Sequence, residues 1–175
     1  AGARWVAPRL LLAHAGSRPR PAPVDNVVLI VVDALRADRL ALDGKTRVRT
    51  PRITATGEAS AGVFRHAVAP SPSSPPSHAA IQSGQMPRLH GVGGDTARPS
   101  PVFSPVSAVL ARAGVATAFH GNNPFAMERL QAASAWSEFH QPNREGHGID
   151  CTAVVKGALG FATRQVGAGK RFFVS

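Results

Sequence analysis

The chain has 175 residues, 43% of them apolar, so it is long enough to bury one hydrophobic core of domain size. Its formal net charge of +10 comes mostly from scattered arginines. Nucleic acid is not the expected partner, because the chain has no tyrosine and no run that mixes basic with aromatic residues. The single cysteine, Cys151, excludes an internal disulfide and a cysteine-based metal cluster.

The first 24 residues precede the predicted domain. Residues 4–14 (RWVAPRLLLAH) are typical of the remnant of a signal or membrane segment, and residues 15–24 combine proline, arginine and small residues as a linker does. No apolar stretch is long enough to span a bilayer. Because the chain begins with Ala1 and closes on the apolar run RFFVS, we interpret it as a piece of a longer protein, with membrane association through a missing N-terminal segment left open.

The folded domain should begin with a strand. Residues 26–32 (NVVLIVV) form a continuous apolar run without polar alternation, which is typical of a strand buried on both faces of a parallel sheet. Thr50 and Pro51 then supply an N-cap and a proline at the first helical position, so a helix is predicted from residue 51 to about 60. Residues 63–69 are predicted as a short strand.

Further along the chain, helices and strands alternate. Helices are predicted over residues 75–82, 104–113, 123–133 and 152–166, and strands over residues 115–119 and 171–175. Gly84 and Gly114 close the first two of these helices. This alternation predicts an α/β fold with a mainly parallel sheet sandwiched by helices.

Asp33 is the first candidate functional residue. It directly follows the first predicted strand, and ligands of open α/β sheets gather at the carboxyl ends of the strands. A carboxylate there can bind a hard divalent cation. Asp33 can equally serve as the N-cap of the next turn, and spacing alone does not separate the two interpretations.

Ser74 is the second candidate. It stands in the segment SPSSPPSH, immediately before a predicted helix whose unpaired N–H groups and dipole favour an anionic substrate and an ionised nucleophile. An inert N-cap or a disordered linker has the same composition, and these features alone favour the inert interpretation.

The order and spacing of several sequence segments together favour a functional role for Ser74 over the inert interpretation. The segments NVVLIVVDALRAD, TPRITATG, SPPSHAAIQSGQMPRLHGV and GKRFFVS follow one another in an order and at spacings that resemble the sulfatase family of the alkaline phosphatase superfamily. That family has a buried strand ending in a metal-binding Asp, a TP-initiated helix and a C-x-P-S-R type nucleophile motif. The resemblance implies an alkaline-phosphatase-like fold, with residues 25–175 as the N-terminal part of a catalytic domain, incomplete at its C-terminus.

The resemblance also implies roles for the matching residues. Asp33 becomes a metal ligand, and Ser74 becomes both nucleophile and metal ligand. His78, in place of the family's Arg, becomes a catalytic residue that hydrogen-bonds the nucleophile or the transferred group, unless it is a satisfied buried polar residue. The implied cofactor is one divalent metal ion, calcium first, with manganese, magnesium or zinc as alternatives.

Two further residues are predicted to contact the substrate. His120 stands at the carboxyl end of the strand at residues 115–119, although a loop histidine needs no function. Lys170 aligns with a substrate-binding lysine of the family, and a cation at a helix C-terminus is its alternative.

Three departures from the family pattern qualify the site. Ala34 replaces a second acidic ligand, so the metal would be held more weakly. His78 stands where the maturation machinery prefers Arg, which argues against conversion of Ser74 to formylglycine. The family's remaining metal ligands lie far beyond residue 175, so we expect this fragment alone to be inactive and to bind no divalent cation tightly.

The predicted function is therefore that of a sulfatase-like sulfuric ester hydrolase with a metal-assisted nucleophile at Ser74. The alternatives are a phosphodiesterase or phosphoglycerol transferase with unmodified Ser74, and a non-catalytic module that keeps the fold. The expected substrate is a small-molecule or glycan ester of sulfate or phosphate. Family habit predicts an extracytoplasmic location, periplasmic or membrane-anchored.

Overall fold

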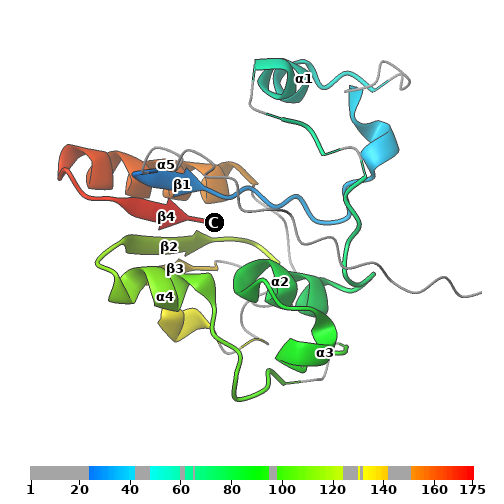
Figure 1. Ribbon diagram of the computed structural model, residues 1–175. Coiled ribbons are helices and arrows are strands. Elements are labelled where there is room, and N and C mark those ends of the chain that lie inside the picture. Colours follow the sequence, from blue (N-terminus) through cyan, green and yellow to red (C-terminus); the bar gives the residue numbers. More distant parts are fainter. Residues whose placement is uncertain are drawn as a thin grey trace, which may run out of the picture.

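A four-stranded parallel sheet lies at the centre of the computed structural model, which describes residues 24–41, 48–59, 62–64, 66–94, 98–123, 130, 132–141 and 151–175 (Figure 1). The strands run in the order β1-β4-β2-β3. Their bounds are β1 (Asn26–Val28), β2 (Ala116–His120), β3 (Glu138–His140) and β4 (Phe172–Val174). The prediction of an α/β fold with a parallel sheet is confirmed.

Helices cover both faces of the sheet. Helix α5 (Cys151–Gly167) packs on β2 and β4, while α4 (Val106–Arg112) packs on β2 from the other side, where α2 (Ser74–Ser83) and α3 (Pro87–His90) also lie (Figure 1). The remaining elements among the described residues are α1 (Pro51–Ala59) and the 3-10 turns η1 (Ala37–Arg39) and η3 (Ala133–Ala135). None of the helices that the structure describes is long and apolar enough to cross a membrane.

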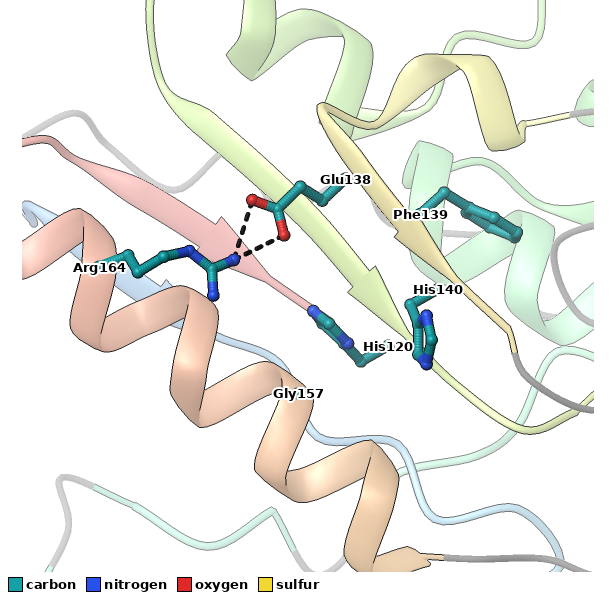
Figure 2. Close-up of a pocket in the computed structure, with 6 residues that line it drawn as sticks. All are labelled: His120, Glu138, Phe139, His140, Gly157 and Arg164. Carbon is teal, nitrogen blue, oxygen red and sulfur yellow. Dashed lines mark hydrogen bonds and ion pairs between the residues drawn. The ribbon is translucent and has the colours of Figure 1, made fainter.

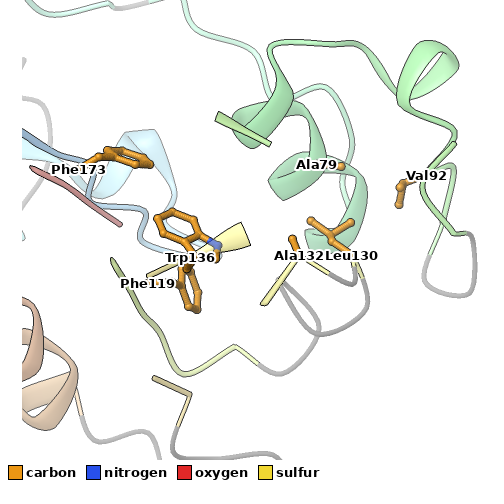
Figure 3. Close-up of a cluster of buried hydrophobic side chains, with 7 residues drawn as sticks. All are labelled: Ala79, Val92, Phe119, Leu130, Ala132, Trp136 and Phe173. Carbon is orange, nitrogen blue, oxygen red and sulfur yellow. The ribbon is translucent and has the colours of Figure 1, made fainter. Parts of the chain in front are cut away.

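Alternating side chains along the strands build two apolar cores. On the α4 side, the Trp136 ring lies 5.7 Å from that of Phe119 and 5.4 Å from that of Phe173, measured between ring centres (Figure 3). Ala79 of α2 belongs to the same cluster, so the helix that begins at Ser74 is anchored to this side of the sheet. On the α5 side, Phe161 packs against Ala118, Phe172 and Val174.

Two of the predicted strands differ from the structure. The strand predicted over residues 26–32 forms only over Asn26–Val28 and is exposed rather than buried on both faces, because it is the edge strand and pairs only with β4 among the described residues. The strand predicted over residues 63–69 is absent from the described residues there, 63–64 and 66–69. Phe64 and Val68 are almost fully exposed, so neither packs in a core.

The predicted helices beginning near residues 51, 75, 104 and 152 are all present, and β3 and α3 are elements that the sequence analysis missed. Residues 124–129 and 131, within the helix predicted over 123–133, lie outside the described residues, and residues 133–135 form the 3-10 turn η3. The predicted signal remnant and all but residue 24 of the predicted linker also lie outside them.

Candidate active site

Asp33 and Ser74 lie 41 positions apart in the sequence but are hydrogen-bonded in the structure. The Ser74 hydroxyl donates to Asp33 Oδ2 over 2.9 Å. Asp33 does not directly follow the strand as predicted, because β1 ends at Val28, five positions earlier. Ser74 is the first residue of α2, so the contact joins the chain beyond a strand's carboxyl end to a helix N-terminus. The structure thus brings together the two residues predicted as metal ligand and nucleophile.

A strained turn holds the Asp33 carboxylate. The N–H group of Ala34 donates to Asp33 Oδ1 over 2.9 Å, which leaves Oδ2 to accept the Ser74 hydroxyl. Ala34 adopts a left-handed conformation with φ of 55°, which costs a residue with a Cβ atom about 1–2 kcal/mol. Strain of this kind persists where the surrounding structure imposes it, and functional sites are common places for it.

Asn123 is a site residue that the sequence analysis missed. Its side-chain amide donates to Asp33 Oδ2, the oxygen that also accepts the Ser74 hydroxyl. The preceding Asn122 has both polar side-chain atoms buried and without a hydrogen-bond partner among the described residues. The available signal was a pair of asparagines just beyond a predicted strand, where ligands gather in open α/β sheets.

His78 lies one helical turn after Ser74, on the same side of α2, and is only 9% exposed. Burial lowers the pKa of its imidazole below the usual 6.5, and the negative charge of Asp33 opposes this with a smaller effect that raises it. The ring is therefore neutral at pH 7. As a neutral ring it can donate one hydrogen bond, but it does not replace the positive charge of an arginine.

The N-terminus of α2 is firmly held. Pro75 and Pro76 are buried in its first turn, and the Ser77 hydroxyl donates to the carbonyl oxygen of Ser71 over 2.9 Å. The helix runs for ten residues before it ends at Gly84, whose φ is 68°. Ser74 therefore stands at the positive end of a regular helix dipole, where an anion is stabilised.

The structure does not bring the two predicted substrate contacts to the Asp33–Ser74 pair. The side chain of His120 lies on the opposite face of the sheet, against Gly157 of α5 (Figure 2). It is on that face because strand residues alternate, and His120 shares the side of Ala118. Lys170 is exposed and precedes β4, so it lies at the edge where the strands begin, whereas Asp33 lies beyond their ends.

The donor atoms at the Asp33–Ser74 pair fit a hard divalent cation in kind. Carboxylate and hydroxyl oxygens suit calcium, magnesium or manganese, whereas zinc prefers nitrogen and sulfur. Calcium takes about six to eight oxygen ligands. Among the residues that the structure describes, no group of three or more His, Cys, Asp or Glu side chains is placed to hold a metal ion, so these residues offer only part of a coordination sphere.

Comparison with known proteins adds an independent finding. The family model described as Sulfatase matches residues 25–174, a stretch that contains Asp33, Ser74 and all four strands. No curated protein and no solved structure matches the chain. The parallel α/β architecture is consistent with the fold of this family, whose members generally use a divalent metal ion. The chain therefore belongs to the sulfatase family, whose members are hydrolases of the alkaline phosphatase superfamily.

Proposed function

We propose that this chain carries the nucleophile of a sulfuric ester hydrolase, and that Ser74 is that nucleophile. The hydrogen bond of 2.9 Å from Ser74 Oγ to Asp33 Oδ2, at the N-terminus of a ten-residue helix, carries the proposal. The expected substrate is a sulfate ester of a small molecule or a glycan.

Each neighbouring group has a distinct role in this proposal. The carboxylate of Asp33 accepts a hydrogen bond from the Ser74 hydroxyl and so orients the Oγ lone pairs toward the ester. The distance of 2.9 Å between the two oxygens is short enough for Asp33 to take the hydroxyl proton as a general base. The Asn123 amide donates to the same carboxylate oxygen and restricts its rotation. The helix N-terminus stabilises negative charge on Oγ and on the ester.

A divalent cation, calcium first, would be held by Asp33 and Ser74 and would neutralise charge on the ester and on the nucleophile. His78, neutral at pH 7, would contribute a hydrogen bond to the transferred group. The amide of Asn122, which has no hydrogen-bond partner in the part of the chain that the structure describes, is a further hydrogen-bonding group beside Asn123 at the end of β2.

A second candidate is transfer of a phosphodiester or phosphoglycerol group to unmodified Ser74. The observation that favours it is the buried, neutral His78 at the position where the family pattern has Arg. Without that arginine, conversion of Ser74 to formylglycine is disfavoured, and direct attack by the hydroxyl remains.

Mass spectrometry of the tryptic peptide 66–88, which contains Ser74, shows which group is the nucleophile. A peptide lighter by two hydrogens identifies formylglycine and supports sulfate ester hydrolysis. An unmodified serine leaves the Ser74 hydroxyl as the nucleophile for either ester, and the relative activity on sulfate esters and phosphodiesters then separates the two candidates.

Activity tests the nucleophile itself. The product of the complete gene is assayed against aryl sulfates and aryl phosphodiesters, as wild type, as Ser74→Ala and as Ser134→Ala, the same substitution at an exposed serine of η3. We expect Ser74→Ala to lower kcat by at least about 10³-fold and Ser134→Ala to leave it unchanged. If the wild type is inert on both substrates, or if Ser74→Ala keeps full activity, the chain is a non-catalytic module with this fold.

A further inference from the structure

Two histidines lie side by side on neighbouring strands, on the face of the sheet opposite Ser74. His120 of β2 pairs in register with His140 of β3, and the centres of their rings are 5.7 Å apart at an interplanar angle of 47°. Both side chains line a cavity of about 440 Å³ between β2, β3 and α5, together with Glu138 and Arg164 (Figure 2).

The His120 ring has unsatisfied hydrogen-bonding capacity. Both of its nitrogens are buried and have no hydrogen-bond partner among the described residues. Its Nδ1 lies against Gly157, where an added Cβ atom would come within 2.5 Å of it. This leaves Nε2 as the candidate ligand atom.

The charge state of the ring suits a metal ligand. The pKa of His120 is lowered by burial above all, and then by the neighbouring His140 and Arg164, while Glu138 opposes the shift. The imidazole is therefore neutral at pH 7, with one nitrogen lone pair available.

The spacing of the rings also suits a shared ion. Zinc binds imidazole nitrogen at about 2.0–2.1 Å, so two imidazoles on one tetrahedral zinc have ring centres about 5 Å apart. The observed 5.7 Å is only slightly longer. Because the side chain of His140 is exposed, a small rotation of that ring closes the difference.

An anion is the alternative occupant of this cavity, because Arg164 lines it. However, one guanidinium nitrogen of Arg164 is already committed to both carboxylate oxygens of Glu138, at 3.0 and 2.8 Å, and this ion pair neutralises the charge. The neutral imidazole of His120 then offers a lone pair rather than a positive charge. The cavity is better suited to a cation that prefers nitrogen.

We propose that His120 and His140 form a binding site for a borderline divalent transition-metal ion, of the zinc and copper class, separate from the oxygen site at Asp33 and Ser74. Water completes the coordination of the ion. The site is independent of the proposed ester hydrolysis.

The test is calorimetric titration of the tag-free full chain with zinc chloride in a chelator-free buffer at about pH 7.5. We expect one zinc per chain, an affinity at least about tenfold weaker in His140→Ala, and no change in His66→Ala, the control at another exposed histidine. Copper(II) bound to the wild type should show hyperfine coupling to two nitrogens in electron paramagnetic resonance, and coupling to one in His140→Ala.

The direction in which one further substitution changes the zinc affinity distinguishes a cation site from an anion site. Arg164→Gln removes a positive charge from the cavity, so it should tighten zinc binding, whereas an anion site would be weakened. Asp33→Asn should leave zinc binding unchanged, which distinguishes this site from the one proposed for catalysis. Zinc binding that is absent, unaffected by His140→Ala, weakened by Arg164→Gln or lost in Asp33→Asn overturns the proposal.

Discussion

Ala34 occupies a left-handed backbone conformation, with φ of 55°, directly after Asp33. Replacing it by glycine removes a steric cost of about 1–2 kcal/mol from the native state. Glycine also gives the unfolded chain more conformational freedom, which offsets about 0.4–1 kcal/mol of that gain. We therefore expect Ala34→Gly to raise the free energy of unfolding by about 0.5–1 kcal/mol, and the melting temperature by about 1–4 °C for a chain of this size.

Urea denaturation followed by circular dichroism measures this effect, with Ala111→Gly as the matched control. Ala111 is an exposed residue of α4 whose backbone is helical, so the same substitution there should lower stability by about 1 kcal/mol. The midpoints of the two variants should move in opposite directions at an unchanged m-value. If Ala34→Gly destabilises the chain as Ala111→Gly does, the turn after Asp33 stores no strain and the reasoning is refuted.

The described contacts support three other predictions. Ala34→Asp places a second acidic side chain beside Asp33, as in the family pattern. Calorimetry should then detect tighter calcium binding than in the wild type. An unchanged affinity would contradict an oxygen-ligand metal site at Asp33. Gly91→Ala should lower the free energy of unfolding, measured by urea denaturation, by about 1–2 kcal/mol. Gly91 has φ of 79°, and an added Cβ atom would lie 3.0 Å from the backbone nitrogen of Ser100. The control Gly93→Ala should leave stability unchanged, because an added Cβ atom there would meet open space. His78, His90 and His120 each have a pKa that burial lowers. Below about pH 6.5 the unfolded chain therefore binds more protons than the native one, so the free energy of unfolding should fall as the pH is lowered from 7.5 to 5.5. A rise over that range would contradict these pKa shifts.

Local patterns were enough to predict most of the helices and the class of the fold. Proline near residues 51 and 75 and glycine at 84 and 114 mark helix ends through backbone constraints that act within a few residues, and these helices are present in the structure. The exposure of β1 was not predictable in this way, because an apolar run is the same whether a strand lies in the middle of a sheet or at its edge.

The candidate site was likewise predictable from local sequence only in part. The sequence by itself determined that a carboxylate follows a strand at Asp33 and that a serine opens a helix at Ser74, because both depend on their immediate neighbours. Only the tertiary structure decided that these two meet, that the Asn123 amide joins them, and that His120 faces α5 instead. The physical reason is that strand register and helix packing, set by contacts between distant segments, select the face on which each side chain lies.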